Sequence, residues 1–310
     1  MKPLKKYLSN SYLRIKMKRE NKFTFKNKES SIISWVTAYD YPIAHCAEIA
    51  GIDMILVGDS GAMVQHGHGS TVPITMHSML TMCKSTRRGA PNTFIVGDMP
   101  FGSYEVSNEQ AVQNAIKFLK EGNCDAVKLE GGKRIANRIE AISQAGIIVI
   151  GHIGLTPQSA TQLGGYKVQG KGIKDFDSLV EDALALQQAG ATAILLEAIP
   201  EPCSRMIKAN VEIPIFGIGA GAGLDGQLLI SNDALGLYPN FKPRFAKNFF
   251  NEVLKKKITN DKNFTAIELF AESLSLYKLE VNDSTFPSQD YSYPISEDDL
   301  ANVKKSSYWK

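Results

Sequence analysis

Ionisable side chains stand at the ends of five successive apolar stretches of this sequence, where charged groups are unusual. Each stretch is a short run rich in Val, Ile and Leu, and the polar residues lie in or just after its last few positions. These residues are Asp59, Asp98, Lys128, Glu130, His152 and Glu197. Lys128 and Glu130 are two residues apart, so on a β-strand their side chains point to the same side.

The acids in this set predict a site for a divalent cation. A single carboxylate after a strand is commonly just a helix N-cap. Four carboxylates at neighbouring strand ends repel one another and raise one another's pKa values unless a cation lies among them. Oxygen ligands in a site that retains water suit Mg2+ better than Zn2+. We therefore predict a magnesium site that uses Asp59, Asp98 and Glu130.

The runs that carry these residues belong to a regular alternation of strand-like and helix-like segments. The predicted strands lie within residues 31–40, 53–60, 92–100, 124–132, 146–154, 191–200, 212–221 and 227–236. Amphipathic segments separate them, such as residues 107–123, with Ser107 as N-cap and Gly122 as C-cap. Near-continuous apolar strands with helical crossovers predict a parallel sheet covered on both faces. The fold class is therefore α/β, and eight units fit a (β/α)8 barrel, with a doubly wound open sheet as the alternative.

Composition places the chain among ordinary globular proteins, with 44% hydrophobic and 22% charged residues in 310. We predict one barrel over residues 29–285, a basic N-terminal extension over 1–28 and a polar tail over 286–310. No run approaches the ~20 apolar residues of a membrane span, and the first residues do not resemble a secretory signal. Four scattered cysteines without a CxxC pair favour free thiols, so we expect a cytoplasmic protein.

Three loops invite a further interpretation. "HGHG", with His66 and His68, supplies two imidazoles but no third zinc ligand nearby in the sequence. "GIGAG" at 217–221 is either a phosphate cradle after the seventh strand or a site of close backbone packing. "LGGYKVQGKG" at 163–172 has the composition of a mobile lid or of a long surface loop.

Several motifs resemble the successive signatures of the ketopantoate hydroxymethyltransferase family. They run in order from about residue 20 to about residue 290 and include "VTAYDYPIA", "VGDS", "HGSTVPIT", "GDMPF", "VKLEGG", "GHIGLTPQS" and "GGYKVQG". The resemblance implies a Mg2+-dependent (β/α)8 barrel of the phosphoenolpyruvate mutase/isocitrate lyase type that assembles as a homo-oligomer, a decamer. It also implies transfer of a one-carbon unit from the co-substrate 5,10-methylenetetrahydrofolate to 3-methyl-2-oxobutanoate, giving 2-dehydropantoate in pantothenate biosynthesis.

The resemblance also assigns roles to single residues. The metal ligands that it implies are Asp59, Asp98 and Glu130. The keto-acid contacts that it implies are Asp59, Ser60, Asp98 and Lys128. Glu197, in "LLEAIP", matches the catalytic acid/base, and His152 is either a second candidate base or a hydrogen-bonding contact of the substrate.

The chain departs from the family pattern in the loop after the second predicted strand. Gly61-Ala62 stands where the family usually has Leu-Gly, and Gly69 stands where it usually has an acid. These departures concern the loop, whereas the residues with predicted chemical roles are intact.

Other functions remain open at the level of sequence. A C–C lyase of the isocitrate lyase type would use the same metal site but needs an acid, often a cysteine, on a lid, and no cysteine lies in a Gly-rich loop. A Mg2+-dependent keto-acid aldolase that uses a free aldehyde differs only in its independence of folate. A non-catalytic barrel that binds an acidic metabolite is a third alternative. The combination of Lys128, Glu130 and Glu197 argues against it. No nucleic-acid or membrane partner is expected.

Overall fold

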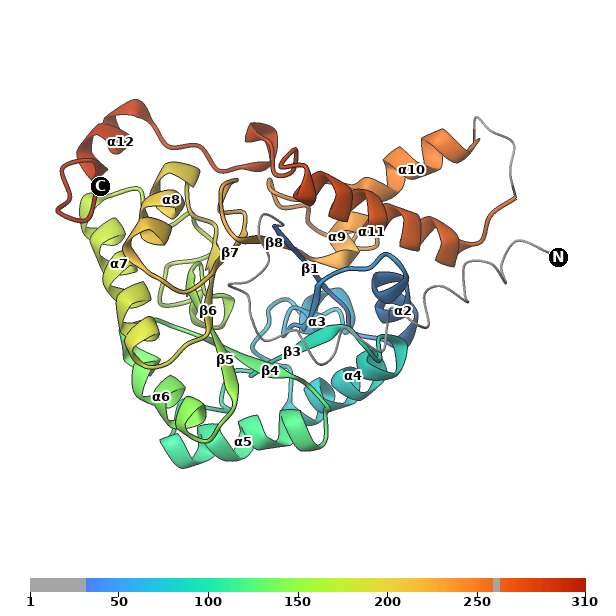
Figure 1. The fold of residues 1–310 in the computed structure, drawn as a ribbon, viewed down its shortest axis with the longest axis horizontal. Coiled ribbons are helices and arrows are strands. Elements are labelled where there is room, and N and C mark those ends of the chain that lie inside the picture. The colour runs from blue at the N-terminus through green and yellow to red at the C-terminus, as the bar shows by residue number, and fades with distance from the viewer. Residues whose placement is uncertain (1–31, 259–262) are drawn as a thin grey trace.

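A closed barrel of eight parallel strands forms the centre of the molecule, in the order β1 to β8 (Figure 1). The computed structural model describes residues 32–258 and 263–310, so the predicted extension over 1–28 lies outside the described residues. The strands are β1 (Ile33–Thr37), β2 (Met54–Val57), β3 (Phe94–Asp98), β4 (Ala126–Glu130), β5 (Ile148–Gly154), β6 (Ala193–Glu197), β7 (Ile215–Ile218) and β8 (Gly226–Leu229). Strands β1 to β7 lie within runs predicted from the sequence, and β8 begins one residue before the run at 227–236. The closed barrel confirms the predicted fold over the open sheet.

Helices follow most of the strands and surround the barrel (Figure 1). The α-helices are α2 (Tyr41–Ile49), α3 (Gly61–Val64), α4 (Met76–Gly89), α5 (Asn108–Lys120), α6 (Ala136–Gln144), α7 (Ile173–Gln188), α8 (Glu201–Asn210), α9 (Ser231–Leu235), α10 (Phe249–Ile258), α11 (Ala266–Asn282) and α12 (Glu297–Val303). Short 3-10 turns are η1 (Lys133–Ile135), η2 (Pro157–Ser159) and η3 (Gln289–Tyr291).

Side-chain caps fix where several of these helices begin. The Ser107 side chain accepts a hydrogen bond from the Gln110 backbone N–H at the start of α5, as the sequence predicts. That helix ends at Lys120, and Glu121 rather than Gly122 occupies its C-cap, with Gly122 as the next residue. Thr265 and Glu268 form a reciprocal capping box at the start of α11.

The register of the strands decides which strand-end groups face one another. Asp98 pairs with Lys128 across β3 and β4, and Glu130 pairs with His152 across β4 and β5. Gly154 pairs with Glu197 across β5 and β6. Since side chains alternate along each strand, these pairings place the ionisable groups on one side of the sheet.

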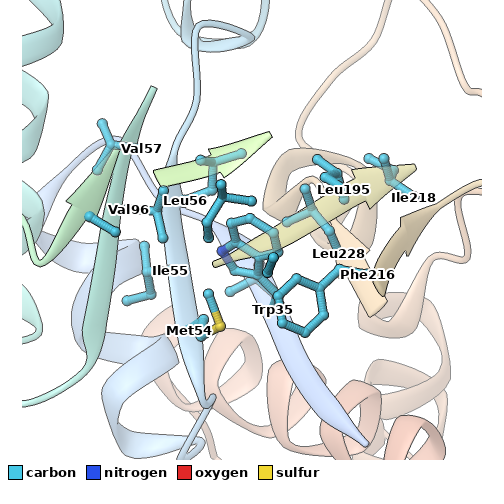
Figure 2. Packing of buried hydrophobic residues seen from close by; sticks show 14 of the residues in the cluster. Trp35, Met54, Ile55, Leu56, Val57, Val96, Leu195, Phe216, Ile218 and Leu228 are labelled. Carbon is cyan, nitrogen blue, oxygen red and sulfur yellow. The ribbon is translucent and has the colours of Figure 1, made fainter. Parts of the chain in front are cut away.

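Apolar side chains fill the barrel below that polar layer. The rings of Trp35 and Phe216 meet edge to face with centroids 5.6 Å apart, and both are fully buried. Figure 2 shows Leu228 beside these rings and Met54 and Leu56 on their other side. A packed interior of this kind closes the barrel beneath the site, so the site opens only at the C-terminal ends of the strands.

The C-terminal part of the chain packs against the barrel. Helix α11 lies against β1 and α2, and the hydroxyl of its Tyr277 shares its single hydrogen between the backbone oxygens of Trp35 and Gln227, 3.0 and 2.6 Å away. The segment 286–310, predicted as a polar tail, includes α12, and its Trp309 ring lies 5.8 Å from that of Phe176 on α7. The division of the chain at residue 285 stays a prediction. No helix in the described ranges is both long and apolar enough to cross a membrane.

Candidate active site

Lys128 occupies the centre of a buried cluster at the C-terminal ends of β3, β4 and β5. Its Nζ lies 2.7 Å from Oδ1 of Asp98 and 3.4 Å from Oε1 of Glu130. The same ammonium lies 3.3 Å from Nδ1 of His152. All four residues are at most 2% exposed, so these contacts are formed away from bulk water. The structure therefore brings together four of the residues that the sequence singles out.

His152 connects this cluster to Glu197 on β6. Its Nδ1 lies 3.4 Å from Oε1 of Glu130, and its Nε2 lies 3.2 Å from Oε2 of Glu197. Because the Lys128 ammonium can only donate, its approach to Nδ1 favours the neutral tautomer that carries its hydrogen on Nε2. That hydrogen faces Glu197 without being aligned for a good hydrogen bond. Ionisable groups thus form a continuous row from Asp98 to Glu197.

Asp59 and Ser60 lie at the end of β2, beside the cluster. The backbone N–H of Asp59 donates to Oδ2 of Asp98 at 3.0 Å, which ties the two strand ends together. Ser60 Oγ lies 2.9 Å from the hydroxyl of Tyr39, which follows β1. Asp59 itself is buried and hydrogen-bonded into the same cluster, which accounts for a carboxylate soon after a buried strand.

Burial sets the electrostatics of the cluster. It raises the pKa of Asp59, of Asp98 and of Glu130, with Lys128 opposing the rise in each case. Burial alone would lower the pKa of Lys128, but the three neighbouring carboxylates raise it above its ordinary value, so the lysine stays charged. One ammonium among three carboxylates leaves an excess of negative charge that a further cation would neutralise.

Burial and the Lys128 charge lower the pKa of His152, and burial raises the pKa of Glu197. A neutral imidazole beside a carboxyl group with a raised pKa is suited to hold or pass a proton near neutral pH.

The donor set fits Mg2+ better than a softer metal. Asp59, Asp98 and Glu130 offer only carboxylate oxygens, which are the ligands that Mg2+ prefers. One of these oxygens, Oδ1 of Asp98, lies 2.7 Å from the Lys128 ammonium without an aligned hydrogen bond. In the described ranges, no three His, Cys, Asp or Glu side chains are arranged as a complete ligand set. The fit to Mg2+ rests on the oxygen-only donors, since Mg2+ usually takes one or two protein carboxylates and completes its shell with water and substrate.

The three loops noted in the sequence differ in what the structure shows. His66 and His68 are exposed, with ring centroids 6.4 Å apart. The 217–221 segment comprises the last two residues of β7 and the three that follow, and a Cβ added at Gly221 would lie 2.3 Å from the Cβ of Glu201. This space is filled by side chains, so the contacts are those of close packing rather than of an open phosphate cradle.

The loop over 163–172 reaches toward the charged cluster. Burial raises the pKa of Tyr166, and the negative charges of Asp59, Glu197 and Glu130 contribute to that rise. Its side chain is still about half exposed. A lid role for this loop stays a prediction.

Two buried residues of the site were not predicted from the sequence. Gln158, in η2, donates from Nε2 to Oδ2 of Asp59 at 2.9 Å, and its backbone N–H donates to Oε2 of Glu130 at 3.0 Å. The Tyr104 hydroxyl donates to Oε1 of Gln158 at 2.6 Å. Gln158 belongs to the motif "GHIGLTPQS", and this membership is the one sequence feature that could have pointed to it. Tyr104 lies beyond the motif "GDMPF" and has no such feature.

The sequence profile described as ketopantoate hydroxymethyltransferase matches residues 18–289. The chain belongs to this family. A relative from Alkaliphilus metalliredigens, named 3-methyl-2-oxobutanoate hydroxymethyltransferase, is 47% identical over 268 residues, which cover 86% of this chain and 90% of the relative. The family resemblance of the sequence motifs is thus confirmed, and the chain is an enzyme, a hydroxymethyltransferase.

Solved structures show the same fold at much lower identity. One of 2,3-dimethylmalate lyase, described as a member of the phosphoenolpyruvate mutase/isocitrate lyase superfamily, has a TM-score of 0.56 and 18% identity over 86% of this chain and 98% of that chain. A phosphonopyruvate hydrolase in complex with oxalate and Mg2+ has a TM-score of 0.50 and 13% identity over 83% of this chain and 95% of that chain. This hydroxymethyltransferase therefore shares its barrel fold with these structures.

Proposed function

We propose that this enzyme transfers a hydroxymethyl group to 3-methyl-2-oxobutanoate, giving 2-dehydropantoate in pantothenate biosynthesis. Membership of the family and the name of the relative support this reaction. The observation that carries its chemistry is the buried row of ionisable groups from Asp98 through Lys128, Glu130 and His152 to Glu197. Such a row can bind an anionic keto acid beside a cation and move a proton within the same cluster.

Asp59, Asp98 and Glu130 are the residues that would hold Mg2+. When bound, Mg2+ acts as a Lewis acid on the oxygens of the keto acid and makes the hydrogen on its C3 more acidic. The excess of carboxylates over ammonium groups in the cluster supports this assignment. The Mg2+ in the related phosphonopyruvate hydrolase is consistent with it.

Lys128 supplies a fixed positive charge for the developing enolate of the substrate. Its pKa is raised by Asp98, Glu130 and Asp59, so it remains an ammonium in the buried site despite the cost of burial. A preorganised charge of this kind stabilises negative charge that develops on the keto-acid oxygens. Asp59, Ser60, Asp98 and Lys128 together would position the keto acid.

Glu197 is proposed to remove the single proton on C3 of the keto acid, which the new carbon–carbon bond then replaces. It lies on β6, more remote from Asp98 than Glu130 is, and contacts the cluster through His152. His152 would then hold Glu197 in place or receive its proton, and the alternative is that His152 itself is the base. The two assignments make different predictions for hydrogen exchange, which are given below.

The one-carbon donor is proposed to be 5,10-methylenetetrahydrofolate, with water supplying the hydroxyl group of the product and tetrahydrofolate leaving. The keto-acid aldolase or lyase alternative uses the same enolate but no folate. The test is to incubate the enzyme with 3-methyl-2-oxobutanoate and Mg2+, with and without methylenetetrahydrofolate, and to detect 2-dehydropantoate by mass spectrometry. We expect product only with folate and Mg2+, and loss of product after chelation with EDTA that returns on addition of Mg2+. Product from free formaldehyde alone at an equal rate would favour the aldolase, and full activity after exhaustive chelation would contradict the metal.

Location and assembly complete the proposal. The cysteines at 46, 83, 124 and 203 are free and buried, which supports the reducing environment of the cytoplasm. A homo-oligomer, a decamer by family resemblance, stays a prediction that light scattering of the purified protein would test.

A further inference from the structure

Gln158 links two carboxylates that lie on different strands of the barrel. It lies in η2 directly after β5 and is 6% exposed. Its Nε2 donates to Oδ2 of Asp59 at 2.9 Å and to the backbone oxygen of Met99 at 3.0 Å. Its backbone N–H donates to Oε2 of Glu130 at 3.0 Å. One residue therefore contacts Asp59 after β2 and Glu130 at the end of β4.

Tyr104 fixes the orientation of the Gln158 amide. Its hydroxyl donates its single hydrogen to Oε1 of Gln158 at 2.6 Å and, with that hydrogen used, accepts the backbone N–H of Glu130 at 3.2 Å. The opposite amide orientation would place Oε1 against a carboxylate oxygen and a carbonyl oxygen, which cannot donate. Tyr104 is 1% exposed, so water does not compete for these bonds.

We infer that Gln158, oriented by Tyr104, is a positioning residue that sets the spacing of Asp59 and Glu130. The inference rests on the proposed function, in which these carboxylates bind Mg2+. Gln158 hydrogen-bonds one oxygen of each carboxylate, Oδ2 of Asp59 and Oε2 of Glu130. The other oxygen of Glu130, Oε1, faces the cluster 3.4 Å from Nζ of Lys128. Groups that hydrogen-bond the ligands of a metal typically change its affinity by about 10- to 100-fold when removed.

A glutamine suits this role because the position needs a donor and an acceptor on one uncharged side chain. A glutamate would add another negative charge beside Asp59 and remove the donor. An apolar side chain would leave Oδ2 of Asp59 without its amide partner in a buried place, which is costly for a carboxylate. In any variant the backbone N–H of residue 158 remains for Glu130, so substitution acts mainly on Asp59.

The test compares two buried glutamines, Gln158 and Gln227. Gln227 lies on β8, is 4% exposed and donates to the backbone oxygen of Gly221 at 3.0 Å. Mg2+ alone is titrated calorimetrically into folded wild type, Gln158→Met and Gln227→Met. We expect the Kd of Mg2+ to rise about 10- to 100-fold in Gln158→Met and by less than about twofold in Gln227→Met. High Mg2+ should restore much of kcat in Gln158→Met.

Tyr104→Phe keeps the ring and removes only the hydroxyl, so it tests the same positioning role if Gln158→Met does not fold. Tyr277→Phe is its matched control, because it likewise loses a buried tyrosine hydroxyl, in this case one with two backbone partners away from the cluster. We expect the Kd of Mg2+ to rise at least about threefold in Tyr104→Phe alone. An unchanged Kd in Tyr104→Phe, and in Gln158→Met wherever it folds, would overturn the inference while the proposed function stands. Wild-type enzyme that binds no Mg2+ would overturn both.

Discussion

His152 Nε2 lies 3.2 Å from Oε2 of Glu197, while the other ring nitrogen of His152 lies among the groups proposed to hold the metal. The pair joins the proposed proton shuttle to the proposed metal ligands. Burial lowers the pKa of His152 and raises that of Glu197, so both changes favour the neutral forms. The pair can therefore take up a proton at Glu197 without creating two adjacent charges.

Glu130→Gln should weaken Mg2+ binding in a way that added Mg2+ partly overcomes. The substitution keeps the size of the side chain and removes one negative charge, and an amide is a poorer Mg2+ ligand than a carboxylate. We expect activity at low Mg2+ to fall and to recover partly as Mg2+ is raised, measured as initial rates over a Mg2+ series. An activity loss that is independent of Mg2+ would remove Glu130 from the metal site.

Glu197→Gln should lower kcat by roughly 10²- to 10⁴-fold, the usual scale for a general acid or base. Since Glu197 is proposed to lie off the metal, raised Mg2+ should not restore the rate, and affinity for Mg2+ and keto acid should stay near wild type. Glu197→Gln and Glu130→Gln are matched controls for one another, because they remove the same charge from two positions on either side of His152.

Exchange of the C3 hydrogen of the keto acid in D2O, without folate, identifies the base. If Glu197 is the base, Glu197→Gln should lose this exchange, as measured by NMR or mass spectrometry. Exchange that persists while product formation fails would assign the base to His152 and place the role of Glu197 in the folate half of the reaction. A His152→Gln variant measured in the same way would then lose the exchange.

Asp233, on α9, should make the protein less stable as pH rises toward neutrality. Burial raises its pKa from 3.8 to about 7, with Lys242 opposing the rise. The folded state therefore binds this proton more tightly than the unfolded chain, so stability is lost as pH rises from about 4 to about 7. The difference of about 3 between the two pKa values corresponds to roughly 4 kcal/mol at most.

Asp233→Asn removes this penalty, so its midpoint of thermal unfolding should exceed that of wild type at pH 8 and approach it near pH 5. Asp298→Asn, at an exposed position of α12, is the control and should show no such trend. A difference between Asp233→Asn and wild type that is the same at both pH values would contradict the assignment.

Deletion of residues 1–16 should leave kcat/KM nearly unchanged. The family profile begins at residue 18, and no predicted site residue precedes Asp59. A loss of more than tenfold in kcat/KM, about 1.4 kcal/mol in transition-state stabilisation, would show that the basic segment contributes to the reaction.

The strands and the edge that carries the chemistry were predictable from the sequence alone. Apolar runs of four to seven residues with helical crossovers specify a parallel sheet, because both faces of each strand must be buried. Asp59, Asp98, Lys128, Glu130 and Glu197 then had to gather at one edge, since parallel strands end together. The motifs that these residues belong to also indicated the family.

The contacts within the site were decided by the tertiary structure. Lys128 bridges Asp98 and Glu130, and Gln158 reaches Asp59 across 99 positions in the sequence. Such contacts depend on the stagger between neighbouring strands and on the path of the loop after β5, and neither leaves a periodic pattern in the sequence. A glutamine in a loop has no charge or spacing that distinguishes it from a surface residue, so only its burial between two carboxylates reveals its role.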